Sequence, residues 1–352
     1  MSKADKIKTF DPNSIADAYG NLFGLPFTTE EAEVVIIPVP WEVTVSYSVG
    51  TAAGPMAIFD ASSQVDLYDP NVEDAWKIGI AMEEEDKQLE AKSRELRDKA
   101  EYYLTAYGEG ARAETTPDMA SALTEINAAC EEMNAAVKEK VKAQLNKNKV
   151  VGLLGGDHST PLGMMRALAE HYEDYAILQI DAHADLRDAY EGFEFSHASI
   201  MFNALKIKQV SKLVQVGIRD YCEAEKNIID NSNGRIKTFF DRDIKQALYN
   251  GENWDTTCER IIKELPQHVY LSFDIDGLDP KLCPNTGTPV AGGFEAEQVL
   301  YLIEKLVKSG KKLIAFDINE VAPGEDEWDA NVGARLLYRI ANLAAISNGR
   351  KP

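Results

Sequence analysis

From residue 150 to the C-terminus, short apolar runs alternate with stretches of helical pattern. Each run is nearly continuous in apolar residues, and a similar run, VVIIP, occupies residues 34–38. The later runs lie at residues 150–154, 176–180, 213–216, 236–240, 269–273 and 313–316. Strands that are apolar on both faces and separated by helices are typical of a parallel sheet covered on both sides. The sequence therefore predicts an α/β fold with a mainly parallel sheet.

A segment at about residues 83–147 differs from the rest because it is rich in Glu, Lys and Ala and contains no strand-like run. We predict two helices here, the first at about residues 85–106 and the second capped by Thr116 with Pro117 in its first turn. Apolar residues of the second helix recur at three- and four-residue steps, which predicts a packing stripe. These residues are Met119, Leu123, Ile126, Cys130, Met133, Val137, Val141 and Leu145. The chain is thus predicted to be one domain of residues 1–352 with a helical-hairpin insertion, packed on the sheet or on a neighbouring subunit.

Residues up to about 29 are predicted to form a partly ordered arm, with FGLPF as its one apolar segment.

The charge of the chain limits its partners. It carries 58 acidic against 37 basic residues, a formal net charge of -21. Such a surface argues against nucleic acid and anionic membranes and favours small cationic molecules. The four cysteines are far apart, which fits neither a disulfide framework nor a zinc ribbon, and no run is long enough to span a membrane. We therefore expect a cytoplasmic location.

Polar motifs follow four of the predicted strands: GGDHS, DAHAD, DIDGLDP and DINEVAP. Because ligands bind at the carboxyl ends of strands in open α/β sheets, these motifs are expected to meet in space. The converging residues are His158, Asp181, His183, Asp185, Asp274 and Asp276, with His197 and Glu320 nearby. Three of the five histidines of the chain are in this set, whereas His171 is predicted to lie at the surface and His268 to be structural.

The donor set predicts metal binding. In an extended segment Asp181, His183 and Asp185 point to one side, where they would repel one another unless a cation lay between them. Four carboxylates and two imidazoles exceed what one catalytic zinc takes. They suit two divalent ions about 3.5–4 Å apart. Oxygen and imidazole donors without a thiolate indicate Mn²⁺, with Ni²⁺, Co²⁺ and Fe²⁺ as alternatives.

These motifs, in this order, resemble those of the ureohydrolase family, which includes arginases, agmatinases and formiminoglutamases. The resemblance covers roughly residues 34–78 and 150 to the C-terminus. It implies a three-layer α/β/α sandwich, a centre of two Mn²⁺ ions, hydrolysis of linear amidines, and a homo-oligomer that is a trimer or hexamer. It also implies that His158 and Asp185 bind one ion and His183 and Asp276 the other. Asp181 and Asp274 would bridge the two ions.

The resemblance further implies that a metal-bridging hydroxide attacks the planar amidine carbon and that Asp185 carries a proton to the leaving nitrogen. His197, in EFSHAS, matches a proton-shuttling histidine, and an unperturbed pKa suits that work. Glu320 matches a carboxylate that pairs with the substrate guanidinium. The alternatives are that His197 is satisfied by a backbone carbonyl and that Glu320 is simply a charged residue ending a strand.

The substrate loops LRDAYEGFEFSHAS and LCPNTGTPVAGG are similar to those of agmatinases. Agmatine, converted to putrescine and urea in polyamine biosynthesis, is therefore the predicted substrate. The acidic residues Asp188, Glu191 and Glu194 are expected to attract its distal amine or to form a solvated rim. Cys283 and Asn285 are expected to border the pocket.

Other substrates stay open, namely guanidinobutyrate, guanidine, arginine and formiminoglutamate. Arg187 would suit the carboxylate of formiminoglutamate, but the presence of His197 argues against that activity. Two further alternatives are a single-metal deacylase of similar fold and a non-catalytic metal-binding scaffold that uses the helical insertion to dock a partner.

Overall fold

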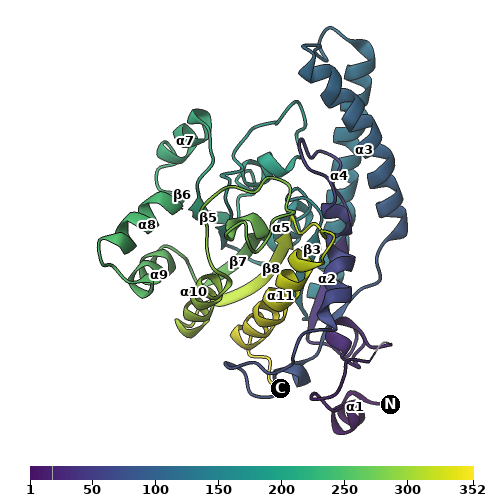
Figure 1. The fold of residues 1–352 in the computed structure, drawn as a ribbon, viewed down its shortest axis with the longest axis vertical. Helices are drawn as coiled ribbons and strands as arrows, with labels where there is room; N and C mark the ends of the chain where they lie inside the picture. Colours follow the sequence, from purple (N-terminus) through teal and green to yellow (C-terminus); the bar gives the residue numbers. More distant parts are fainter. Residues whose placement is uncertain (18) are drawn as a thin grey trace.

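A parallel sheet forms the middle layer of the computed structural model, which describes residues 1–17 and 19–352 (Figure 1). Its eight described strands have the order β2-β1-β3-β8-β7-β4-β5-β6, and every pair is parallel. The strands are β1 (Val34–Val39), β2 (Ile80–Met82), β3 (Val150–Gly155), β4 (Tyr175–Ile180), β5 (Val210–Ile218), β6 (Ile236–Phe240), β7 (His268–Asp274) and β8 (Lys312–Asn319). All seven predicted strands are present. Strand β2 was not predicted because three residues are too short to show a period.

Helices cover both faces of the sheet, which confirms the predicted three-layer α/β/α architecture (Figure 1). Alternate residues of a strand face opposite layers, as in β4, where Leu178 and Ile177 belong to different core clusters. The helices that contribute to one cluster are α2 (Gly54–Ser62), α8 (Asp241–Tyr249), α9 (Trp254–Lys263), α10 (Ala296–Lys308) and α11 (Trp328–Ser347). Those of the other are α3 (Lys87–Gly108), α4 (Pro117–Asn146), α5 (Leu162–His171), α6 (Ile200–Ala204) and α7 (Glu223–Asp230).

Helices α3 and α4 form the predicted hairpin, whose far end lies at the top of Figure 1. Ion pairs join the two helices, Lys92 with Glu132 and Lys99 with Glu125. The apolar stripe of α4 is buried apart from half-buried Leu123, and it packs on α5 and the sheet of the same chain. Thr116 is the N-cap residue of α4 and Pro117 opens the helix, as predicted, although the Thr116 side chain makes no capping hydrogen bond within the described structure.

The N-terminal segment departs from its prediction. Helix α1 (Lys3–Thr9) is exposed or half-buried, but Leu22, Phe23, Leu25 and Phe27 are fully buried in the core. The backbone N–H of Phe23 donates to Ser62 Oγ of α2 at 2.8 Å. Residues 22–27 are therefore part of the folded body and not a partly ordered arm.

The four central strands bring the predicted motifs together. The chain passes from β3 to β4 across the positions that β8 and β7 fill later, so the carboxyl ends of β3, β8, β7 and β4 are adjacent. Ile180 pairs with Phe273, which places Asp181 and Asp274 side by side just beyond paired residues. Open α/β sheets bind ligands where the order of successive strands reverses in this way. Of the helices in the described chain, none is long and apolar enough to cross a membrane.

Candidate active site

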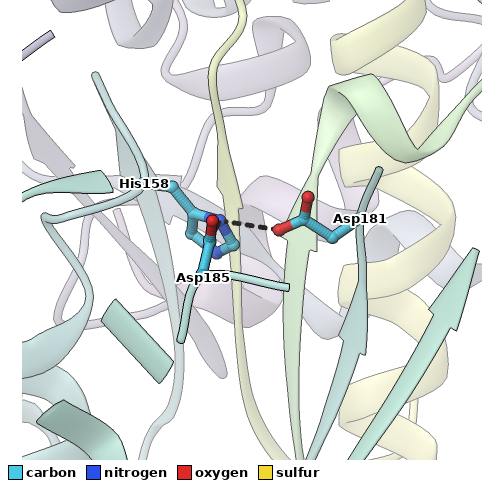
Figure 2. Close-up of side chains that lie close together, drawn as sticks. All are labelled: His158, Asp181 and Asp185. Carbon is cyan, nitrogen blue, oxygen red and sulfur yellow. Dashed lines mark ion pairs between the residues drawn. The ribbon is translucent and has the colours of Figure 1, made fainter. Parts of the chain in front are cut away.

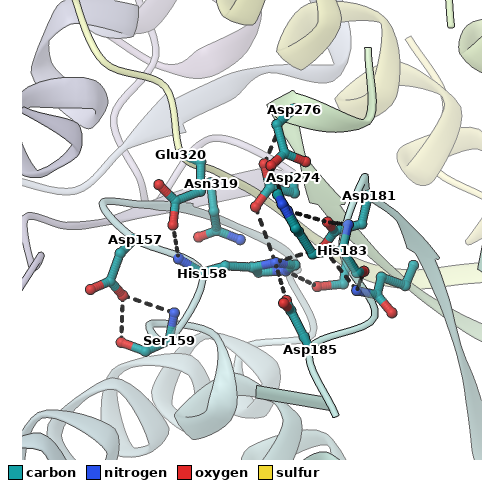
Figure 3. Close-up of polar contacts among 12 residues, drawn as sticks. Asp157, His158, Ser159, Asp181, His183, Asp185, Asp274, Asp276, Asn319 and Glu320 are labelled. Carbon is teal, nitrogen blue, oxygen red and sulfur yellow. Dashed lines mark hydrogen bonds and ion pairs between the residues drawn. The ribbon is translucent and has the colours of Figure 1, made fainter. Parts of the chain in front are cut away.

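The six predicted metal ligands converge at this sheet edge, and the first group gathers around His158 (Figures 2 and 3). His158 Nδ1 lies 3.0 Å from Asp181 Oδ2, 3.1 Å from Asp185 Oδ2 and 3.3 Å from Asp274 Oδ2. All four side chains are buried. These four residues come from the ends of three strands, β3, β4 and β7, so the fold is required to assemble them.

A second group shares Asp181 with the first. His183 Nδ1 lies 2.9 Å from Asp276 Oδ2 and 3.7 Å from Asp181 Oδ1. Asp181 thus offers one oxygen to each group, the geometry of a bridging carboxylate. The second oxygen of Asp274, Oδ1, accepts a hydrogen bond from the Asp276 N–H at 2.9 Å. The bridging roles expected of Asp181 and Asp274 stay predictions.

The hydrogen bonds on the Nε2 side of the His158 ring determine its tautomer, and so whether Nδ1, which faces the three carboxylates, carries a proton. Ser272 Oγ donates to Asp317 Oδ1 at 3.1 Å, so it accepts from His158 Nε2 at 3.0 Å. Nε2 then carries the proton, and Nδ1 makes no hydrogen bond within the described structure although three carboxylates surround it. A lone pair aimed at three carboxylates is repulsive unless a proton or a metal cation lies between them. The residues present therefore fit a divalent cation.

The pKa shifts of the clustered side chains also indicate a cation-binding site. Burial lowers the pKa of His183, but the carboxylates of Asp276 and Asp181 outweigh this effect and raise it to about 12. Burial, together with the negative charge of Asp181, raises the pKa of Asp185 to about 7. The pKa of Asp274 is raised well above its usual value for the same reasons, burial and neighbouring carboxylates. The cluster carries excess negative charge that bound cations would offset.

Two site residues have left-handed backbones, Asp185 with a φ of 55° and Glu320 with a φ of 64°. This conformation is uncommon for residues other than glycine and is often found at functional sites. The carbonyl of Asp185 accepts from the N–H groups of Met201 and Phe202 at 3.1 Å each, which holds the strained turn against α6.

Glu320 directly follows β8 and is buried beside the two ligand groups. Its Oε1 accepts from the His158 N–H at 2.9 Å. A Cβ on Gly287 would lie 3.0 Å from its Oε2, so glycine keeps the space beside that oxygen open. Burial, together with the negative charges of Asp157 and Asp276, raises the pKa of Glu320 well above its usual value. A cationic group bound beside Glu320 would favour its ionised form.

His197 begins a short 3₁₀ turn, His197–Ser199, and is half-buried at the wall of the cavity. Its Nδ1 has no hydrogen-bond partner among the described residues, so the alternative of a carbonyl-bound histidine is not favoured. Burial lowers its pKa to about 4, and the positive charge of His183 adds to the effect. The expectation of an unperturbed pKa was therefore wrong, and the ring is neutral near pH 7.

A cavity of about 470 Å³ opens onto His183, Asp185 and His197. Glu320 lines a smaller adjoining hollow that shares His197 with this cavity. The volume of the cavity is within the usual range for small-ligand pockets. His183 and Asp185 lie at its inner end, and its walls include His197, Tyr190 and Tyr47. Its lining also includes Asp220, Glu225 and Arg187. The Arg187 Nε lies 3.3 Å from Glu225 Oε2, so its charge is already paired.

The cavity corrects several expectations. Asp188, Glu191 and Glu194 are absent from its described lining, so their expected attraction of an amine is not supported. Cys283 and Asn285 are absent from it too, and the side chain of Asn285 binds Asp329 at the start of α11. Besides Asp185, two carboxylates line the cavity, Asp220 and Glu225, and both were missed. Both follow the carboxyl end of β5. The rule that ligands bind at the carboxyl ends of strands, the strand-end rule, would have found them if it had been applied to β5.

Comparison with known proteins agrees with this architecture. A family model described as the arginase family matches residues 32–342. The N(1)-aminopropylagmatine ureohydrolase of Thermus thermophilus is 30% identical over 323 residues, which span 91% of this chain and 93% of that protein. The agmatinase of Bacillus anthracis is 28% identical over 300 residues, 85% and 87% of the two chains. Among solved structures, agmatine ureohydrolase of Thermoplasma volcanium has a TM-score of 0.68 and 24% identity, with 97% of each chain covered. A formiminoglutamase variant of Trypanosoma cruzi has a TM-score of 0.69 at 14% identity, with 97% and 98% covered, so these two structures show similarity of fold.

Proposed function

Because the chain belongs to the arginase family of C–N hydrolases, we propose that it hydrolyses a cationic guanidino compound at a centre of two divalent metal ions. The observation that carries this proposal is the pair of ligand groups sharing Asp181 at the inner end of a cavity. Single-metal chemistry would leave the second group, His183 with Asp276, without a role.

The metal ligands follow from the two groups. His158, Asp185 and Asp274 would hold one ion, His183 and Asp276 the other, with Asp181 shared. Mn²⁺ is the proposed metal, with Ni²⁺, Co²⁺ and Fe²⁺ as alternatives for the same donor set. When bound, two such ions supply a strong nucleophile by lowering the pKa of water.

Three side chains would bind the substrate and move protons. The free oxygen of Glu320 would pair with the planar guanidinium and orient its carbon toward the metal groups. Asp185 would accept a proton and return it to the leaving nitrogen. His197, neutral near pH 7, would relay a proton between that nitrogen and the cavity.

The charge of the cavity supports a cationic tail on the substrate. Asp220 and Glu225 provide two carboxylates against the one guanidinium of Arg187. Agmatine fits this pattern and would yield putrescine and urea. N(1)-aminopropylagmatine is the second candidate because the Thermus thermophilus relative takes its name from that compound. Substrates with a carboxylate, such as guanidinobutyrate or formiminoglutamate, would meet the Asp220 charge and depend on releasing Arg187 from Glu225.

A product screen tests the proposal. The Mn²⁺- and Ni²⁺-loaded protein is assayed with agmatine, N(1)-aminopropylagmatine, arginine, guanidinobutyrate, guanidine and formiminoglutamate, with urea or formamide as the readout. We expect the highest kcat/KM for agmatine or its aminopropyl derivative. Faster turnover of an acidic substrate would overturn the cationic assignment. Failure of all six would favour a non-catalytic scaffold, and one ion per chain in anomalous scattering would contradict the two-metal centre.

A cytoplasmic location, a role in polyamine biosynthesis and a homo-oligomeric state stay predictions.

A further inference from the structure

The α3–α4 hairpin contacts both loops that wall the cavity. The first wall loop is defined as residues 41–48, of which Ser46 and Tyr47 line the cavity. The second wall loop is residues 188–199, of which Tyr190, His197 and Ala198 line the cavity. Neither loop is part of the hairpin, so these contacts join the insertion to the site.

Helix α3 holds the first wall loop through two polar side chains. Ser93 Oγ accepts from the Glu42 N–H at 3.1 Å. Arg97 Nη1 donates to the carbonyl of Val43 at 3.2 Å and also to that of Val45. The next two residues after Val45 are the ones that line the cavity, so the guanidinium of Arg97 fixes the backbone from which they project.

The hairpin holds the second wall loop through one residue from each helix. Tyr103 Oη of α3 donates to the carbonyl of Glu191 at 2.9 Å. Asn127 of α4 makes two bonds, with Nδ2 donating to the Gly192 carbonyl at 3.3 Å and Oδ1 accepting from the Glu194 N–H at 3.0 Å.

The fit between hairpin and loop is close at Gly192. Its φ is 91°, and a Cβ there would lie 2.7 Å from Tyr103 Oη and 3.1 Å from Leu123 Cδ2. The Phe193 ring lies 5.1 Å from the Tyr103 ring. The loop therefore approaches the hairpin as near as a glycine backbone permits.

These contacts come from one face of α3. Ser93, Arg97, Ala100 and Tyr103 are spaced by four, three and three residues, the spacing that places side chains on one side of a helix. Since a helix is rigid over this length, the separation of Arg97 from Tyr103 constrains the separation of the two wall loops. The loops also meet directly, where Thr44 Oγ1 donates to the Phe195 carbonyl at 3.5 Å.

We propose that the α3–α4 hairpin is a positioning element for substrate binding, in which Arg97, Tyr103 and Asn127 hold the two wall loops at the spacing that the substrate requires. The catalytic consequence rests on the proposed function, whereas the anchoring of the loops does not.

Hydrogen–deuterium exchange on the metal-loaded full chain tests the anchoring. Tyr103→Phe removes one hydroxyl, with Tyr102→Phe as its control because Tyr102 is exposed next to it. Arg97→Met removes the guanidinium, with Arg94→Met as its control because Arg94 is exposed and pairs with Glu90. We expect Tyr103→Phe to speed exchange in the second wall loop, and Arg97→Met in the first, by about five- to tenfold, the effect of losing one or two hydrogen bonds. Both controls should leave both loops at the wild-type rate.

Unchanged exchange in both loops, or a rise spread over the whole core, would overturn the anchoring. Steady-state kinetics tests the consequence on whichever substrate the screen identifies. Tyr103→Phe and Arg97→Met should raise KM several-fold with the metal content unchanged, and Arg97→Lys should recover part of the loss. Loop exchange that rises without any change in KM would overturn the positioning role. If the wild-type chain hydrolyses no substrate, the proposed function fails, and the exchange data alone still decide whether the hairpin anchors the loops.

Discussion

His158 and Ser272 are joined by a hydrogen bond of 3.0 Å between Nε2 and Oγ, on the side of the ring away from the carboxylates. Ser272 in turn donates to Asp317, which also accepts from Tyr270, Asn319 and the backbone of Phe273. Burial raises the pKa of Asp317 to about 6, and the donors around it limit that rise, so it is a carboxylate near pH 7. The chain from Asp317 through Ser272 then sets the tautomer of His158. Residues outside the two ligand groups thus determine that Nδ1 of His158, the nitrogen facing the carboxylates, carries a lone pair.

Ser272→Ala should weaken metal binding because it releases the ring of His158 and its tautomer. Losing such an outer partner typically costs about 10- to 100-fold in metal affinity. Competition titration with a chelating dye measures it, with Ser63→Ala, on the exposed end of α2, as the control. Wild-type affinity in Ser272→Ala would mean that the ring is held by packing alone.

Asp276→Asn should remove one ion per chain and nearly all activity, because His183 would lose its partner at 2.9 Å and the second group would be incomplete. Elemental analysis counts the metal and the product assay follows the activity. Asp188→Asn is the matched control because the Asp188 side chain is 82% exposed. Two ions and full turnover in Asp276→Asn would contradict the two-metal centre.

Asp220→Asn should raise KM for agmatine by about five- to tenfold, the effect expected from losing a partly exposed ion pair of about 1 kcal/mol. KM for guanidine, which has no tail, should stay the same. The difference between the two substrates is the measurement that matters, because a general disturbance of the site would raise both KM values. An equal rise for both would remove Asp220 from the substrate assignment.

His197→Asn should lower kcat by about 10²-fold or more, the usual contribution of proton transfer by a positioned side chain. Metal content should be unchanged, since the ring belongs to neither ligand group. A matched change in His171→Asn, on the exposed end of α5, should have no effect. If His197→Asn kept the wild-type kcat, His197 would be a wall residue without a role in proton transfer.

Metal affinity should rise with pH. Burial alone would lower the pKa of His183, but the neighbouring carboxylates raise it from 6.5 to about 12 in the metal-free chain. The ring is therefore protonated between about pH 6 and 8, and a cation must displace that proton to bind. Each proton released makes affinity increase about tenfold per pH unit. Titration calorimetry in buffers of different ionisation enthalpy counts the protons, and a pH-independent affinity would contradict the assignment of His183 as a ligand.

Local patterns in the sequence were sufficient to predict the strands and the ligand motifs. The apolar run at residues 176–180 and the alternation of Asp181, His183 and Asp185 depend only on the two-residue period of an extended backbone. The strand-end rule then placed Asp274, Asp276 and Glu320 near them without any knowledge of strand order. The resemblance to a known family supplied the roles of those residues. It did not predict the pKa of His197, which burial lowers to about 4.

Only the tertiary structure decided which residues meet across long distances in the chain. Residues 22–27 look like an exposed arm in sequence, but their burial depends on contacts with α2 that no local pattern encodes. Asn285 lies in a substrate-loop motif, yet it binds Asp329 because α11 begins beside it. The hydrogen bonds of Ser272 with Asp317 arise from the pairing of β7 with β8. Likewise, Arg97 and Tyr103 read as ordinary helix residues until the packing of α3 brings the wall loops to them. A sequence specifies short-range periodicity directly, whereas side-chain contacts between distant segments follow from strand order, register and packing, which only the folded chain sets.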